Sequence, residues 1–296
     1  MKVTKKIIEI KKNIQSIDLE LFVVGSGNPK TFLMSGVHGN EKTGQIIIEK
    51  ILASDLSFEG TLTMLPIANP TGFENNTREE TTSNLDLNRN FCDRDGDELV
   101  DELITTILSL AKEHDRVIDL HSFKTAGLIQ VVSNHVGDSD DVAMLFSPDV
   151  VRTSGKNRML KATGSFCSYA KAAEIPYLLF ELPLHNKTTS EQIDTMVSGF
   201  TQVLQSSGSS NKKLEELPHV GMRIIKAEHE GVFVKSNALK LGGVVPVGTL
   251  LGEIITGDTH YPVHSPFGGI ICEMDPDEER SVGIRDTLVG VGELHS

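Results

Sequence analysis

Residues 31–41 read Thr-Phe-Leu-Met-Ser-Gly-Val-His-Gly-Asn-Glu, an apolar run followed by a turn that carries His38 and Glu41. The apolar run predicts a buried strand, and residues 45–52, Gln-Ile-Ile-Ile-Glu-Lys-Ile-Leu, predict a helix after the turn. A histidine and a glutamate at this spacing can bind one Zn²⁺ from the same side, because zinc accepts imidazole nitrogen and carboxylate oxygen. Alone the pair is weak evidence, since about one His-x-x-Glu match is expected by chance in a chain with ten histidines.

Length and composition describe an ordinary globular protein. The 296 residues suffice for one large domain or for a domain with a small companion, and 39% are hydrophobic and 23% charged. The net charge of −13 argues against nucleic acid and against an anionic membrane as partners, because both select a basic surface. We expect no signal peptide, no membrane span and, from three scattered cysteines, no disulfide framework. A cytoplasmic location is therefore expected.

Segments typical of strands and helices alternate over the first two thirds of the chain. Helices are predicted at residues 98–114, where Asp97 caps the N-terminus, and at residues 188–205, where Thr188 and Glu191 form a capping box. Strands are predicted at residues 19–24, 32–35, 61–67, 116–120, 128–132 and 177–182. This alternation predicts an α/β fold with a parallel or mixed central sheet flanked by helices.

The character of the chain changes at residues 206–213, Ser-Ser-Gly-Ser-Ser-Asn-Lys-Lys, which predict a flexible linker. We therefore expect one domain at residues 1–205 and a second at residues 214–296. The second segment has short apolar runs separated by glycine and proline and no helical pattern, which predicts a small all-β domain. Its Gly- and Pro-containing hairpins resemble those of biotinyl- and lipoyl-carrier β-sandwiches. The lysine that carries the prosthetic group in true carriers has no counterpart, so we expect the shape without lipoylation.

Three further polar segments follow or end predicted strands. Residues 85–91 read Leu-Asp-Leu-Asn-Arg-Asn-Phe in a loop, and residues 117–122 read Val-Ile-Asp-Leu-His-Ser at the end of a strand. Residues 178–183, Leu-Leu-Phe-Glu-Leu-Pro, end another strand. Since open α/β sheets build their sites at strand ends, we expect these segments to meet His38 and Glu41 there.

The residue types at this edge suit zinc-assisted hydrolysis of an amide. His38, Glu41 and His121 supply three metal ligands and leave one position for water, whose pKa the metal lowers toward ~7. Glu181 is the candidate general base, which takes the proton of the water and returns it to the leaving amine.

Substrate binding is expected from a second set of side chains. The planar guanidinium of Arg89 matches a carboxylate, and Asn88 beside it completes a clamp. Arg78, ten residues before Asn88, is a candidate to polarise the scissile carbonyl and stabilise the oxyanion.

Taken together, the four motifs resemble the zinc carboxypeptidase superfamily, and more closely its succinylglutamate desuccinylase/aspartoacylase branch. The resemblance covers about residues 30–185 by motif. It implies the carboxypeptidase-like fold, one zinc ion per chain and removal of acyl groups from amino acids. By this resemblance, His38, Glu41 and His121 match the family's zinc ligands. Asn88 and Arg89 match its carboxylate clamp, and Glu181 matches its general acid/base. Arg78 is a weaker match to the family's further arginine.

Other interpretations of these residues remain open. Taken singly, each residue also has a purely structural interpretation. His121 could be read as an interior hydrogen-bonded histidine, residues 88–89 as a surface turn, and Glu181 as an ion-paired residue at a strand end. A metallocarboxypeptidase that acts on peptides or peptidoglycan fragments is the nearer functional alternative to a small-molecule deacylase. A non-catalytic zinc- or ligand-binding protein is the more distant one.

Overall fold

Strand β3 (Lys30–Ser35) contains the apolar run of residues 31–34 and lies inside a mixed sheet. The structure is a computed structural model, and it describes residues 2–12, 15–54, 59–92, 97–153, 164–204 and 212–294. Strands β4 (Gly60–Leu65) and β5 (Arg116–Phe123) flank β3, and β9 (Tyr177–Pro183) follows β5. All four run parallel and are largely buried, as strands covered on both faces must be. The predicted mixed central sheet is confirmed.

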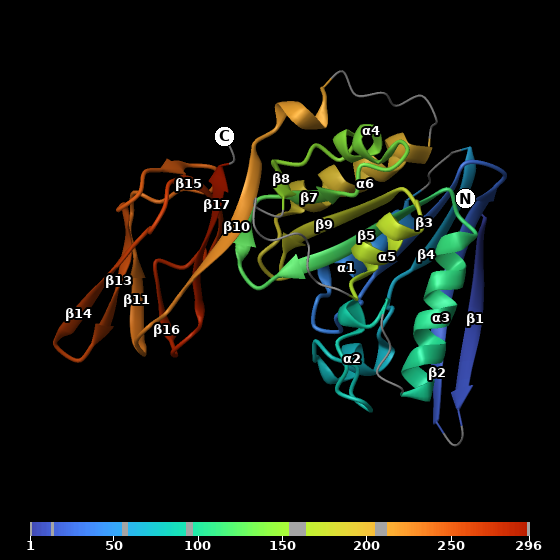
Figure 1. The fold of residues 1–296 in the computed structure, drawn as a ribbon, viewed down its shortest axis with the longest axis horizontal. Coiled ribbons are helices and arrows are strands. Elements are labelled where there is room, and N and C mark those ends of the chain that lie inside the picture. Colours follow the sequence, from blue (N-terminus) through green and yellow to red (C-terminus); the bar gives the residue numbers. More distant parts are fainter. Residues whose placement is uncertain are drawn as a thin grey trace.

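Helices cover both faces of this sheet (Figure 1). Successive side chains of a strand point to opposite faces, so Phe32 joins the apolar cluster under α3 and α5, whereas Leu33 joins the one under α1, α4 and α6. The predicted cap of α3 is confirmed, because the Asp97 side chain accepts two backbone N–H bonds of its first turn. The helices are α1 (Thr43–Ala53), α2 (Pro70–Asn75), α3 (Glu98–Lys112), α4 (Ser139–Met144), α5 (Phe166–Ala172) and α6 (Ser190–Leu204).

The predicted capping box of α6 is wrong by one residue. Thr189 donates its backbone N–H to Gln192 Oε1, and the backbone N–H of Gln192 returns a bond to Thr189 Oγ1, both at 3.1 Å. Thr188 instead donates its hydroxyl to the carbonyl of Pro183, 2.7 Å away. The Thr189–Gln192 pair has the spacing and reciprocal bonds of a capping box, so the cap lies one position later than expected and α6 begins at Ser190.

A long antiparallel hairpin, β1 (Val3–Lys12) and β2 (Gln15–Ser26), forms the edge of the sheet beside α3 (Figure 1). The sequence predicted only residues 19–24 of it. Most side chains of β1 are exposed, lysines among them, whereas Ile10 is buried beneath α3. An edge strand needs only such a thin apolar row, and its lysines discourage pairing with another chain.

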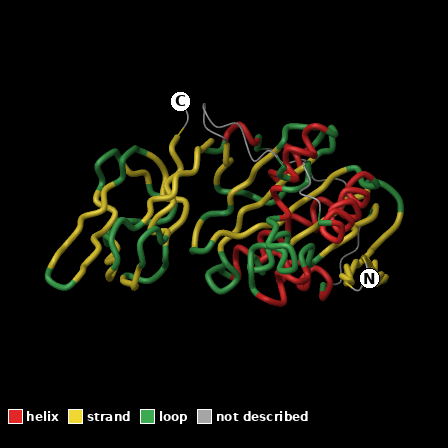
Figure 2. The backbone as a smooth tube through the Cα atoms, turned by 60° about the horizontal axis from the view of Figure 1, so that its bottom comes forward, coloured by secondary structure: helices red, strands yellow, loops and turns green. Residues whose placement is uncertain are grey.

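We call the described residues up to 204 the first unit and residues 212–294 the second unit. The second unit is built from strands, as predicted, apart from a 3₁₀ turn at Leu214–Glu216. Figure 2 shows strands and loops alone beyond that turn. Strands β14, β13, β11 and β16 form a separate sheet over a core that contains Phe233, Leu251 and Val291. The strands are β10 (His219–Lys226), β11 (Gly231–Lys235), β12 (Val244–Val245), β13 (Leu250–Thr256), β14 (Thr259–His264), β15 (Gly269–Met274), β16 (Glu279–Val282) and β17 (Thr287–Leu294).

The main sheet continues from the first unit into the second. Strand β9 pairs with β7 (Gln130–Ser133), β7 with β8 (Val150–Thr153), and β8 runs parallel to β10, which pairs with β17. A second junction joins β15 to β6 (Ala126–Gly127). Residues 206–211 of the predicted linker lie outside the described residues, so the domain boundary stays a prediction.

The longest helices of the described chain, α3 and α6, have 15 residues each. Among the residues that the structure describes, no helix combines the length and the apolar character needed to cross a membrane.

Candidate metal centre

His38 and Glu41 lie on the loop between β3 and α1, at the carboxyl end of the parallel strands. A hydrogen bond from the Glu41 N–H to the His38 carbonyl, 3.1 Å long, closes the turn between them. Gly39 lets this loop approach α2, because a Cβ at that position would lie 1.9 Å from the carbonyl carbon of Gly72. The local sequence therefore fixes both side chains on one side of the turn.

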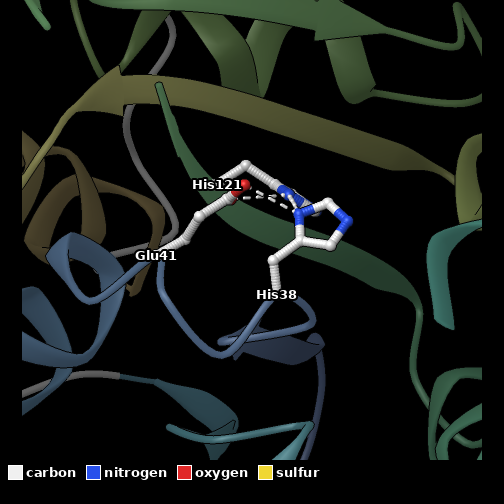
Figure 3. A group of neighbouring side chains, drawn as sticks. All are labelled: His38, Glu41 and His121. Carbon is white, nitrogen blue, oxygen red and sulfur yellow. Dashed lines mark hydrogen bonds and ion pairs between the residues drawn. The ribbon is translucent and has the colours of Figure 1, made fainter. Parts of the chain in front are cut away.

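His121 on β5 completes a triad with His38 and Glu41 (Figure 3). The Glu41 oxygens lie 2.8 Å from His38 Nδ1 and 3.1 Å from His121 Nδ1, and the two Nδ1 atoms are 3.2 Å apart. Both histidine side chains are only 3% exposed. Two ring nitrogens this close repel each other unless a proton or a cation lies between them. The triad is thus a buried group that can hold a metal ion.

Two carboxylates bind the opposite nitrogens of the rings. Asp86 Oδ1 lies 3.1 Å from His38 Nε2, and Asp119 Oδ2 lies 3.0 Å from His121 Nε2. Because an ionised carboxylate only accepts hydrogen bonds, each Nε2 carries a hydrogen and donates it. This arrangement leaves both Nδ1 atoms to act as metal ligands, and such carboxylate partners orient metal-binding histidines.

The electrostatics of the site favour a cation. Burial works to raise the pKa of Glu41, but hydrogen bonds with His121 and His38 hold that pKa well below its usual value. Burial opposes protonation of His121, yet Asp119 and Glu41 raise its pKa well above the ordinary value. Without a metal the triad therefore retains a proton, and a divalent cation would satisfy the same negative charge.

Arg78 lies beside the triad. It forms an ion pair with Asp86, with Nε and Nη2 each 3.0 Å from Oδ2, and its Nη1 is 3.5 Å from Glu41 Oε1. Burial alone would raise the pKa of Asp86, but the hydrogen bond to His38 and the charges of Arg78 and Arg89 hold it well below normal. Both arginines thus act on the carboxylate that orients His38.

Asn88 and Arg89 occupy a short 3₁₀ turn, η1 (Leu87–Arg89), directly after Asp86. Asn88 Oδ1 accepts the backbone N–H of Phe166 at 3.0 Å, which ties this turn to the start of α5. Arg89 Nη1 donates to the carbonyl of Asn88 at 2.7 Å. Both residues therefore follow within three positions of Asp86, the carboxylate partner of His38, while the clamp role stays a prediction.

Glu181 is the register partner of His121 on the adjacent parallel strand. Residues in register share a face of the sheet, so the side chains of Glu181 and His121 leave it on the same side. Glu181 Oε1 forms an ion pair with Arg152 Nη1 of β8 at 3.1 Å. Its role as the general base stays a prediction.

Three residues around the candidate site were not predicted from the sequence: Asp86, Asp119 and Arg152. The two aspartates have a local signal, because each lies in a motif with a predicted site residue, at Asp-Leu-Asn-Arg and Asp-Leu-His. Arg152 has none, since β8 meets β9 only through the pairing of the sheet with β7.

The mixed sheet and the triad at its strand ends define a carboxypeptidase-like α/β fold. Residues 27–182, more than half of the chain, match the succinylglutamate desuccinylase/aspartoacylase catalytic domain. The chain belongs to this family, which supports a hydrolase of the acylase or deacylase type. No curated protein matches the chain in sequence.

Solved structures share the fold over almost the whole chain. The product-bound ectoine utilization protein EutE (DoeB) of Ruegeria pomeroyi is 16% identical with a TM-score of 0.78, covering 98% of this chain and 95% of its own. A succinylglutamate desuccinylase/aspartoacylase of Rhodobacter sphaeroides is 21% identical with a TM-score of 0.76, covering 99% and 96%. An aspartoacylase family protein of Mesorhizobium loti is 16% identical with a TM-score of 0.74, covering 98% and 95%. At these identities the likeness shows the fold.

Proposed function

We propose that this protein is a zinc-dependent hydrolase that cleaves the amide bond of an N-acyl amino acid and releases a carboxylate and the free amino acid. The observation that carries the proposal is the convergence of His38 Nδ1, His121 Nδ1 and the Glu41 carboxylate, with a carboxylate on each remaining ring nitrogen. Family membership supports the acylase chemistry. The product-bound relative supports a small-molecule substrate.

A set of two histidines and one glutamate is typical of catalytic zinc sites, and we propose that His38, Glu41 and His121 hold one zinc ion per chain. When bound, zinc acts as a Lewis acid that polarises a carbonyl and lowers the pKa of water toward ~7. Asp86 and Asp119 keep the two imidazoles in the tautomer and orientation that metal binding requires.

Glu181 is the proposed proton carrier. Its carboxylate takes one proton from the attacking water and passes it to the nitrogen of the leaving amine, so that the amide C–N bond breaks without releasing an anionic amine. The position of Glu181 beside His121 on the next strand supports this role.

Arg89 and Asn88 are proposed to bind the carboxylate of the amino acid. A guanidinium fork gives two parallel bonds, so Arg89→Lys should raise KM about tenfold or more with a smaller change in kcat. An unchanged KM would exclude the clamp.

Arg78 is proposed to stabilise the oxyanion, and Arg78→Met should lower kcat by about 100-fold. Arg223→Lys, at a surface ion pair of the second unit, is the control for both.

The reaction is tested with N-acetyl-, N-succinyl- and N-formyl-amino acids, with dipeptides as the competing substrates. We expect turnover of at least one acyl-amino-acid class and loss of kcat by orders of magnitude in Glu181→Gln with zinc retained. Cleavage of dipeptides alone would make the protein a carboxypeptidase. Zinc binding without any turnover, or full activity in Glu181→Gln, would contradict the proposed reaction.

A further inference from the structure

A buried carboxyl group of the second unit lies close to the proposed base. Glu273 on β15 is 4% exposed, and its Oε1 accepts a hydrogen bond of 2.9 Å from Gln130 Nε2 of β7. Gln130 is the register partner of Glu181 on β9. Glu273 therefore reaches from the second unit to the strand pair that carries Glu181, although none of the proposed steps uses it.

The space around Glu273 is shaped to hold its side chain. A Cβ on Gly290 of β17 would lie 2.8 Å from the Glu273 Cβ, so only glycine leaves room for the carboxyl group there. On the other side of β15, Gly127 of β6 is the register partner of Glu273. Neither of these glycines carries a charge. The charged groups that act on Glu273 are Arg152 of β8 and Glu181 of β9.

Arg152 is shared electrostatically by the two glutamates. Its guanidinium forms the 3.1 Å ion pair with Glu181 and acts on Glu273 through its charge. Burial raises the pKa of the Glu273 carboxyl to about 7, and the charge of Glu181 adds to the rise, while the Gln130 hydrogen bond and Arg152 oppose it. Glu273 therefore changes its charge near neutral pH, and this charge acts electrostatically on Arg152 and Glu181.

We propose that Arg152 is a positioning residue for Glu181 and that Glu273, contributed by the second unit, controls how firmly Arg152 is held there. This inference rests on the proposed function, because it assigns a purpose to the orientation of Glu181. With Glu273 protonated, Glu181 is the ionised carboxylate that faces Arg152, and the ion pair fixes one Glu181 geometry. With Glu273 ionised, two carboxylates compete for one guanidinium and the orientation of Glu181 loosens.

The first test compares kcat and KM of zinc-loaded variants at pH 6, with zinc content measured for each. Glu181→Gln must first lose activity, because full activity in that variant would overturn the proposed function itself. Arg152→Met should then lower kcat about tenfold or more with little change in KM, because small misplacements of a reacting group are costly. Arg152→Lys should recover most of kcat, since a cation can still pair with Glu181.

Lys187→Gln is the matched control. Lys187 forms a 2.7 Å ion pair with Asp275 and also links the two units, but it touches neither Glu181 nor Arg152. Its kcat should stay at the wild-type value even if its thermal stability falls. Unchanged kcat in Arg152→Met, or a raised KM with kcat intact, would overturn the positioning role while leaving the proposed reaction standing.

The second test measures kcat/KM of Glu273→Gln and of the wild type from pH 5.5 to 9. Glutamine keeps the hydrogen bond with Gln130 and cannot ionise. The ratio of the variant to the wild type should be near one at pH 6 and rise as the pH passes about 7, because only the wild type gains a competing carboxylate. A ratio that stays constant over this range would overturn the proposed influence of Glu273 on Arg152.

Discussion

At the level of single residues, the candidate metal centre consists of the triad together with the carboxylates that bind its two histidines. Asp119 is buried, orients His121 through Nε2 and also accepts the Tyr177 hydroxyl at 2.9 Å. Asp86 orients His38 through its Nε2 atom and is itself held by Arg78. The charges of these carboxylates suit the triad to hold a cation.

The residue-scale prediction concerns Asp119. Asp119→Asn keeps the size of the side chain and removes its charge, so zinc affinity should fall about 10- to 100-fold. Competition with a chromophoric chelator measures the dissociation constant. Asp138→Asn is the control, because Asp138 pairs with Arg116 at the opposite end of the same strand. Equal zinc affinity in both variants would contradict the orienting role.

The sequence could predict which residues form the triad, because each motif carries its own chemistry at a strand end. His38, Glu41 and His121 do meet in the structure, although their motifs lie far apart in the chain. Arg152 could not be predicted, because its place depends on which strands pair. The sequence left open whether Glu181 is an ion-paired residue or a site residue. In the structure it forms an ion pair with Arg152 and also lies beside His121 on the next strand.

At the scale of elements, close approach of backbones fixes the site. The loop after β3 carries His38 and Glu41 of the triad and packs against α2 at Gly39. The apolar runs predicted the buried strands because parallel strands are apolar on both faces. The exposed strand β1 and the register of the α6 cap were missed, since an edge strand has a weak pattern and neighbouring Thr188 and Thr189 compete for the cap.

The element-scale prediction is that Gly39→Ala destabilises the protein by about 1–3 kcal/mol and weakens zinc binding, because the added Cβ meets the α2 backbone at 1.9 Å. Urea unfolding of the metal-free protein measures the first effect. Gly268→Ala is the control, since the nearest atom to its added Cβ lies at 3.4 Å. Two variants of equal stability would show that the loop is not tightly packed there.

At the scale of the whole molecule, one sheet runs through both units. The parallel pairing of β8 with β10 and the contact of β15 with β6 place Glu273 beside strands of the first unit. The sequence predicted the all-β character of the second unit from its glycines and short apolar runs. It could not predict this junction, because pairing between distant strands leaves no local pattern.

The whole-molecule prediction is a pH dependence of stability. The pKa of Glu273 is about 7 in the folded protein against 4.5 for an ordinary glutamate, so the folded state binds the proton more tightly. Folding stability that depends on this group is therefore lost as the pH rises from about 4.5 through 7, by up to about 3 kcal/mol. Glu273→Gln should remove that loss, and its stability relative to wild type should grow over this range.

Chemical denaturation of the metal-free proteins at pH 5 and pH 8 measures this difference. Glu293→Gln, which removes a partly exposed carboxylate of the same unit, serves as the control. Equal stability differences between Glu273→Gln and wild type at both pH values would show that Glu273 does not hold its proton in the folded state.

The central claim is that His38, Glu41 and His121 hold the metal on which activity depends, and reconstitution tests it most directly. The protein is stripped with a chelator, and zinc is then titrated back while bound metal and acyl-amino-acid turnover are recorded together. We expect no turnover without metal and full recovery at one zinc per chain, as three-ligand catalytic sites hold. Turnover that persists in the metal-free protein, or a stripped protein that binds no zinc, would contradict it.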